Sequence, residues 1–153
     1  MRRPIAVLIA TTVGMVLFSA APANASATVN WKSVSTNSNW SCGGYINHDS
    51  RQAVRFKACI VTNASGGTQA VLVVQNTSTI YDEYLDRGRV IFESQRGGDV
   101  WCAPTNLAAG ATAGCYAPTV QVGTCTQTDS ASVELTISGA VRSAAVNGRI
   151  TPC

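Results

Sequence analysis

Residues 40–51, WSCGGYINHDSR, contain the side chains most typical of a catalytic cluster, including Cys42 and His48, the only histidine. A cysteine protease would need the Cys42 thiolate beside an imidazole, and a serine hydrolase would need His48 as its base. However, every cysteine has a potential partner in an oxidising compartment, and no G-x-S-x-G motif is present. We therefore predict no catalytic residue. Cys42 is expected in a disulfide, and His48 and Asp49 on the surface of a loop.

A second group of reactive side chains lies in the acidic segment 80–89, IYDEYLDRGR. A glycosidase needs two facing carboxylates at a defined separation, and a calcium loop needs regularly spaced oxygen ligands with a glycine. The spacing D-E-x-x-D lacks that regularity, so this segment is expected to be a solvated connection between two strands. Aromatic side chains beside charges are common at interaction surfaces, and Tyr81 and Tyr84 are therefore predicted to contact a partner.

Three tryptophans are further candidates for binding, because indole rings stack on sugars. Trp101 is adjacent to Cys102 and is expected to pack on a disulfide. Trp31 and Trp40 lie in a polar segment, where a large aromatic side chain is often an anchor that orders on binding a partner. For Trp31, a position at the edge of the core and a role as a partner anchor are equal alternatives.

The first 25 residues are typical of an export signal. Arg2 and Arg3 precede an apolar run over residues 5–18, and residues 23–25, ANA, have the small-x-small pattern of a cleavage site. The run is shorter than the roughly 20 apolar residues of a membrane span. We predict cleavage after Ala25 and a secreted, extracellular mature protein without a membrane anchor.

Removal of this segment changes the charge balance. The full sequence carries 11 Lys and Arg against 8 Asp and Glu, a net charge of +3 at pH 7. Because Arg2 and Arg3 lie in the signal, nine basic residues remain against eight acidic ones, a net charge of +1. Nucleic-acid binding requires basic residues clustered on one face or stripe, and this balance gives no such footprint. We expect no nucleic-acid partner.

All six cysteines lie in the predicted mature chain: Cys42, Cys59, Cys102, Cys115, Cys125 and Cys153. An even number of cysteines in a small exported chain is typical of a disulfide framework. The usual zinc-ligand spacings are missing, because there is no C-x-x-C and only one histidine. We expect three disulfides and neither a metal nor another cofactor. Among the possible pairings we prefer 42–59, 102–115 and 125–153, which close the shortest loops.

Strand patterns dominate the mature sequence. In residues 54–62, VRFKACIVT, apolar residues alternate with Arg55, Lys57 and Cys59. Cys59 therefore lies on the outer side of a half-buried strand, and its partner should cross the outside of the sheet near Cys42. Further strands are expected at 69–75, 88–94, near 101–102, near 115–117, at 120–122 and at 132–138, with an antiparallel return over 140–146. Turns are expected at 62–68 and at Ser138-Gly139.

These short strands, with almost no helical period, predict an all-β fold. We expect one antiparallel β-sandwich domain, or a small barrel, over residues 40–153, braced by disulfides. Residues 26–39 are mostly polar and are expected to form an N-terminal arm or an edge strand. Gly110 and Gly114 interrupt the alanine-rich segment 103–114, which is therefore expected to be a loop.

Four features taken together suggest a family. They are APANA at 21–25, W-x-C at 40–42, FKACI at 56–60 followed by QAVLVVQN at 69–76, and the terminal Cys153. In this pattern, residues 26–153 resemble small exported actinobacterial β-proteins, most of all the adaptor of the umbrella toxin particles secreted by Streptomyces. The resemblance implies a non-catalytic, disulfide-bonded β-domain that joins a spoke of the toxin's repeat-built ring to a lectin-bearing subunit. It also implies docking through the arm that contains Trp31, by strand addition.

We therefore expect a secreted, non-enzymatic interaction module, an adaptor that links subunits of an extracellular antibacterial toxin particle. Its partners would be other secreted proteins, including a repeat-containing toxin and a lectin-bearing subunit. Two alternatives stay open. One is a secreted protease inhibitor that presents loop 43–52 or loop 103–114, and the other is a carbohydrate-binding module that uses the tryptophans.

Overall fold

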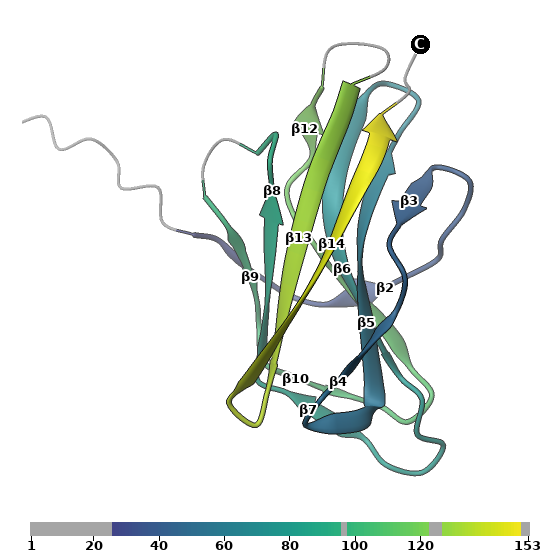
Figure 1. Ribbon diagram of the computed structural model, residues 1–153, viewed down its shortest axis with the longest axis vertical. Helices are drawn as coiled ribbons and strands as arrows, with labels where there is room; N and C mark the ends of the chain where they lie inside the picture. The colour runs from purple at the N-terminus through teal and green to yellow at the C-terminus, as the bar shows by residue number, and fades with distance from the viewer. Residues whose placement is uncertain (1–25, 96–97, 123–126, 151–153) are drawn as a thin grey trace, which may run out of the picture.

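The computed structural model describes residues 26–95, 98–122 and 127–150 (Figure 1). The predicted signal segment 1–25 and the predicted pair Cys125–Cys153 lie outside these ranges. Within them the chain forms β-strands and no helix, so no described segment is a helix long and apolar enough to cross a membrane.

Two antiparallel sheets pack face to face (Figure 1). Sheet A has the order β1-β9-β8-β13-β14, with β1 (Thr28–Val29), β9 (Val100–Cys102), β8 (Arg87–Phe92), β13 (Gln127–Ile137) and β14 (Ala140–Ile150). Sheet B has the order β2-β11-β6-β5-β3, with β2 (Lys32–Ser33), β11 (Thr112–Tyr116), β6 (Gly67–Asn76), β5 (Arg51–Thr62) and β3 (Trp40–Cys42). In addition, β12 (Val120–Gln121) pairs with β6, and β4 (Ile46–His48) pairs with β5.

A short ribbon of β7 (Glu83–Leu85) and β10 (Thr105–Leu107) lies at one end of the two sheets (Figure 1). Among the described strands, β1 alone pairs in parallel, with β9. The sheets do not close into a barrel. The prediction of an all-β fold is therefore confirmed, in its sandwich form.

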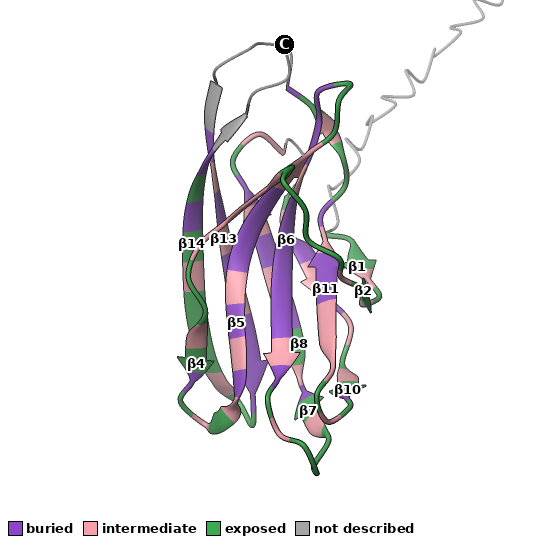
Figure 2. Ribbon diagram, turned by 90° about the vertical axis from the view of Figure 1, so that its right-hand side faces the viewer, coloured by how far each residue is buried: buried purple, intermediate pink, exposed green. Residues whose placement is uncertain are grey.

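The core lies between the two sheets and follows the alternation predicted from the sequence (Figure 2). Along β5, Val54 and Phe56 are fully buried, whereas Arg55 and Lys57 between and after them are only half-buried. Along β13, Val133 and Leu135 are fully buried and Glu134 points outward. An apolar residue at every second position is what a sheet with one covered face requires.

The outer face of sheet B carries a second, smaller apolar cluster. Cys59, Val71 and Val73 are buried there although they point away from the main core. They are covered by Val34 from the N-terminal segment and by Trp40. Because both faces of β6 are covered, its sequence is apolar at consecutive positions.

Residues 26–39 belong to the sandwich as edge strands, one of the two forms predicted for them. β1 pairs with β9 in sheet A, and β2 pairs with β11 in sheet B. The segment after β2 then reaches β5, where the amide of Thr62 donates to the carbonyl of Asn39 over 3.1 Å. The start of the described chain thus links both sheets before the long strands begin.

The two predicted turns are present. Ser138 and Gly139 have φ angles of 52° and 77° and join β13 to β14 without a register shift. Two consecutive positive φ angles characterise the two-residue turn that matches the natural twist of a hairpin. Between β5 and β6, the Asn63 side chain accepts hydrogen bonds from the amides of Ser65 and Gly67, over 2.9 and 2.8 Å.

The prediction of a loop over residues 103–114 is wrong for half of the segment. Residues 105–107 form β10, which pairs with β7, and β11 already begins at Thr112. Residues 103–104 and 108–111 are the parts that form connections, with Gly110 at a φ of 73°. β10 is too short to show its own period, and it is a strand because β7, some twenty residues earlier, supplies a partner.

Candidate protein-interaction surface

Two of the predicted disulfides are present. Cys42 and Cys59 face each other across β3 and β5 on the outer face of sheet B, as predicted. Cys102 on β9 and Cys115 on β11 join sheet A to sheet B through the core. Cys42 is therefore not available as a thiolate nucleophile.

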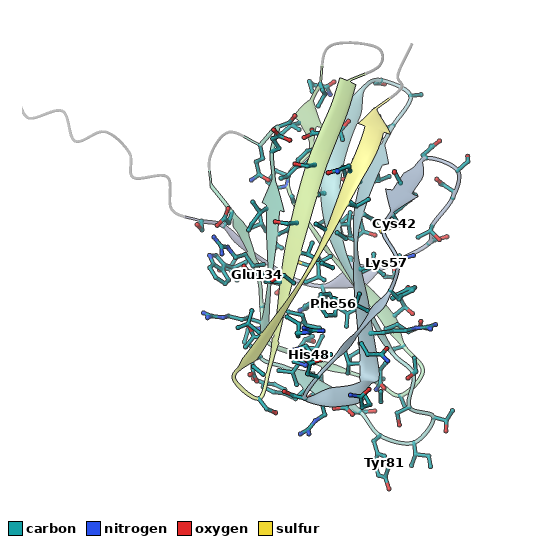
Figure 3. All side chains as sticks on the ribbon, viewed as in Figure 1. Cys42, His48, Phe56, Lys57, Tyr81 and Glu134 are labelled. Carbon is teal, nitrogen blue, oxygen red and sulfur yellow. A yellow bond between two sulfur atoms is a disulfide. The ribbon has the colours of Figure 1, made fainter. Side chains whose placement is uncertain are left out.

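The prediction that His48 lies on the surface is wrong, because its side chain is fully buried between the sheets (Figure 3). Its Nε2 atom lies 3.2 Å from the carbonyl oxygen of Leu135, and its Nδ1 atom accepts the amide of Ser50 over 3.2 Å. Because Nδ1 accepts a hydrogen bond, Nε2 is the ring nitrogen that donates to the Leu135 carbonyl. The ring also packs against Phe56, with 6.3 Å between centroids.

The physical reason is that residues 46–48 form a strand. Ile46 turns toward the core, and His48, two residues later, shares its side of β4. Asp49 is exposed, as predicted, and pairs with Arg142 over 3.1 Å. The histidine and the cysteine of segment 40–51 therefore have separate structural roles and form no catalytic arrangement with each other.

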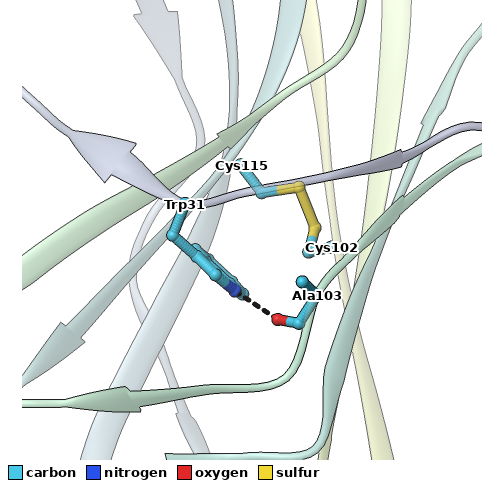
Figure 4. Close-up of a disulfide and its surroundings, with 4 residues drawn as sticks. All are labelled: Trp31, Cys102, Ala103 and Cys115. Carbon is cyan, nitrogen blue, oxygen red and sulfur yellow. Dashed lines mark hydrogen bonds between the residues drawn. A yellow bond between two sulfur atoms is a disulfide. The ribbon is translucent and has the colours of Figure 1, made fainter.

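Trp31 packs at the edge of the core, beside the Cys102–Cys115 disulfide (Figure 4). Its indole Nε1 donates to the carbonyl oxygen of Ala103 over 2.7 Å. Of the two alternatives for this residue, the structure places it at the core edge. Trp40 is also half-buried and meets the ring of Tyr116 edge-on, with 6.1 Å between centroids. The two indoles considered as anchors are thus engaged within the fold.

Trp101 does not pack on a disulfide, contrary to the prediction. Cys102 points into the core, so its strand neighbour Trp101 points outward from sheet A. There the guanidinium groups of Arg87 and Arg89 lie 4.9 and 5.3 Å from the Trp101 ring. All three tryptophans therefore have intramolecular partners, which leaves none as a freely exposed platform for a sugar.

The titration behaviour of two side chains follows from these contacts. Hydrogen bonds to Asp99 and then to Glu134 raise the pKa of Arg89 above its ordinary value, against an opposing effect of burial. Burial raises the pKa of Tyr116, whose hydroxyl donates to the carbonyl of Ser33 over 3.3 Å. Both groups therefore keep their protons at neutral pH.

The acidic side chains of segment 80–89 support the structure of the end of the sandwich. Asp82 accepts the amide of Ala109 over 3.0 Å, and Asp86 accepts the amide of Gly139 over 2.9 Å. Glu83 pairs with Arg51 over 3.3 Å. In the parts of the chain that the structure describes, no three His, Cys, Asp or Glu side chains gather as metal ligands would.

The aromatic residues of the same segment are exposed, and Figure 3 shows Tyr81 at the end of the molecule. Ile80, Tyr81 and Tyr84 have relative exposures of 74%, 70% and 54%. We call these three side chains the tip. Tyr81 and Tyr84, both predicted to contact a partner, are thus both exposed within this segment, whereas Trp31 and Trp40 are half-buried elsewhere.

The loop that carries the tip is held by the buried side chain of Asn76, at the end of β6. Its amide group donates to the carbonyl oxygens of Tyr81 and Leu107, over 2.8 and 3.1 Å, and its Oδ1 accepts the amide of Ser78 over 3.0 Å. The hydroxyl of Ser78 accepts the amides of Ile80 and Tyr81 over 3.2 and 2.9 Å. An exposed apolar loop is therefore fixed by polar groups beneath it.

Ile80 and Asn76 were not recognised from the sequence. Ile80 is one apolar residue within the polar run NTSTIYDE at 76–83, which is a weak signal that could have been noticed. Asn76 follows Gln75 after the apolar run 70–74 and resembles an ordinary turn residue. Its role depends on the carbonyl groups of Tyr81 and Leu107, and the sequence around Asn76 does not show that these groups lie beside it.

We expect Asn76→Ala to loosen this loop, because its amide and carbonyl oxygen anchor both ends. The amides of Ser78, Ile80 and Tyr81 should exchange with solvent at least about tenfold faster, and stability should fall by about 2 kcal/mol. Hydrogen exchange measured by NMR tests this. Thr79→Ala, an exposed change in the same loop, should leave the rates unchanged. Unaltered exchange in Asn76→Ala would show that Asn76 does not hold the loop.

Comparison of the chain with protein-family models, with curated proteins and with solved structures found no match in any of the three.

Proposed function

We propose that this chain is a secreted, non-enzymatic interaction module that acts as an adaptor, joining subunits of an extracellular antibacterial toxin particle. The observation that carries the proposal is the tip, where Ile80, Tyr81 and Tyr84 lie largely in solvent. Its partners are other secreted proteins, and the sequence resemblance suggests a repeat-containing toxin and a lectin-bearing subunit.

The tip has the properties of a protein contact. Single exposed apolar side chains are ordinary on a protein surface, but here three large ones occur within five residues. Tyrosine contributes a large contact area at a low cost in side-chain entropy. Because Asn76 and Ser78 already fix the loop, little further ordering is needed when a partner binds.

A role without catalysis is supported by the chemistry of segment 40–51. Both nitrogen atoms of His48 are engaged in the core, and Cys42 is cross-linked to Cys59. Export is supported by the N-terminal sequence pattern and by the two disulfides, which persist in oxidising compartments.

Capture from the producing organism's culture supernatant tests the proposal. Tagged mature protein should recover a repeat-containing toxin and a lectin-bearing subunit, identified by mass spectrometry. The double variant Ile80→Ser/Tyr81→Ser should lower that recovery about tenfold or more, since side chains at the centre of an interface dominate affinity.

The matched control is Val141→Ser, which removes another apolar side chain, 53% exposed, from β14. It should recover the partners like the unchanged protein. Recovery of the chain alone at every growth stage would contradict the proposal. Equal losses in Val141→Ser and in the double variant would remove the tip as its basis.

A further inference from the structure

Three cations without a carboxylate partner gather on one face of sheet B, whereas Arg87, also without one in the described structure, lies over Trp101 on sheet A. Arg51, Arg89 and Arg142 are each paired with a carboxylate. In contrast, no described carboxylate pairs with Lys32, Arg55 or Lys57. These three side chains all project from the outer face of sheet B, and we call them, with Tyr45 and Tyr116, the cationic face.

Two tyrosine rings support these cations. The Arg55 guanidinium lies 4.6 Å and the Lys57 ammonium 4.4 Å from the centroid of Tyr45. The Lys32 ammonium lies 5.9 Å from the centroid of Tyr116. Arg55 is further oriented by a 2.8 Å hydrogen bond from Nε to the side chain of Gln75, which leaves the outer edge of its guanidinium for another acceptor.

The strand register spreads the charges across the sheet. Lys57 lies opposite Val73 on β6, Val73 opposite Gly114 on β11, and Gly114 opposite Lys32 on β2. Three strand spacings of about 4.8 Å separate the two lysine backbones by about 14 Å. Figure 3 shows Lys57 projecting from β5 away from sheet A. The face is thus broad, and Val34, which lies against Gly114, covers part of the surface between the two lysines.

None of the eight acidic residues of the chain lies on this face. Asp129 is buried in the sandwich, and the other seven lie near the tip, in the β4–β5 turn or on sheet A: Asp82, Glu83 and Asp86; Asp49; Glu93, Asp99 and Glu134. The net charge is small, but the charges are distributed so that one face carries positive side chains and no carboxylate. Such a face favours a partner that carries negative charge.

We infer that the cationic face binds an acidic segment of a partner protein through Arg55, Lys57 and Lys32. Carboxylates suit this surface because the free edge of Arg55 can hold one in two hydrogen bonds, while Lys57 and Lys32 add point charges. Tyrosine and arginine are also enriched at protein interfaces. This surface is separate from the tip, so its test does not depend on the proposed function.

The test uses a defined probe, poly-L-glutamate, with the mature protein at low ionic strength. Binding is followed by NMR chemical shifts and by titration calorimetry. The amides of Tyr45, Arg55, Lys57 and Lys32 should shift most, and 0.3 M salt should abolish the effect. Arg55→Gln/Lys57→Gln should weaken binding about tenfold or more, because both carboxylate contacts near Tyr45 are lost.

The matched control is Arg87→Gln/Arg142→Gln, which removes two positive charges from sheet A and gives the same net charge. It should bind within about twofold of the unchanged protein. If the test variant does not fold, Lys57→Gln replaces it, since the Lys57 ammonium has no carboxylate partner in the described structure. The inference would be overturned if the test and control variants lost affinity equally, if the chemical shifts changed mainly outside the cationic face, or if polyglutamate did not bind. Binding to poly(glycerol phosphate) but not to polyglutamate would also overturn it.

Discussion

Replacement of His48 by alanine is expected to lower the free energy of unfolding by about 3 kcal/mol. The imidazole fills space between the sheets and makes two hydrogen bonds there, to the amide of Ser50 and the carbonyl of Leu135. Alanine would leave a cavity beside Phe56 and remove both bonds. Denaturant unfolding with intact disulfides measures the change.

Two companion variants separate the contributions of packing and hydrogen bonding. His48→Phe keeps a ring against Phe56 but loses both hydrogen bonds, so its cost should be intermediate, about 1–2 kcal/mol. Asn47→Ala, an exposed change on the same strand, should fall within about 0.5 kcal/mol of the unchanged protein. If His48→Ala left the free energy of unfolding unchanged, His48 would not be buried between the sheets.

Removal of the Cys102–Cys115 disulfide should be about equally damaging. The bond closes a loop with a sequence separation of 13 and ties sheet A to sheet B beside Trp31. Cys102→Ala/Cys115→Ala should therefore lower the free energy of unfolding by about 3 kcal/mol, because the unfolded chain without the cross-link has more conformational entropy. Loss of the packing of the two buried sulfur atoms should lower it further. Denaturant unfolding followed by tryptophan fluorescence measures the total change in the free energy of unfolding.

The control for this variant is Cys42→Ala/Cys59→Ala, with Cys125 and Cys153 unchanged in both. That bond closes a loop of similar separation, 17, but it lies on the outer face between strands that already pair. Its removal should cost less, because neighbouring hydrogen bonds hold the same strands together. A larger loss from the outer pair would contradict the view that the inner disulfide holds the two sheets together.

The long strands were predictable from the sequence because their packing is recorded locally. Residues 54–62 and 132–138 alternate between apolar and polar side chains, and one sheet face is buried. The turn at Ser138-Gly139 was likewise evident from residue types. The Cys42–Cys59 pair followed from the side of the strand on which Cys59 lies.

Features that depend on distant pairing were not predictable in the same way. His48 resembled a loop residue in a glycine-rich segment, and only the pairing of β4 with β5 turns it into the core. β10 is a strand because β7 lies beside it. Trp101, adjacent to Cys102, points outward instead of packing on a disulfide, and it is Trp31, seventy residues earlier, that packs beside the Cys102–Cys115 bond.

The candidate interaction surface was predictable only in part. Two tyrosines among acidic residues are an unusual pattern, and this pattern identified Tyr81 and Tyr84. The rigidity of the loop was not visible, because it depends on Asn76 reaching carbonyl groups of two segments. The positive outer face of sheet B was also hidden, since Lys32 comes onto the same face as Lys57 only through the strand order of sheet B.

Site-specific photo-crosslinking tests the role of the tip most directly. A photoreactive phenylalanine derivative is placed at Tyr81, and in a control at Ser143, an exposed position on β14. Both proteins are exposed to the native culture supernatant and irradiated. If the tip contacts the partner, position 81 should crosslink to a secreted toxin-particle subunit and position 143 should not. A crosslink from position 143 alone, or equal crosslinks from both positions, would contradict it.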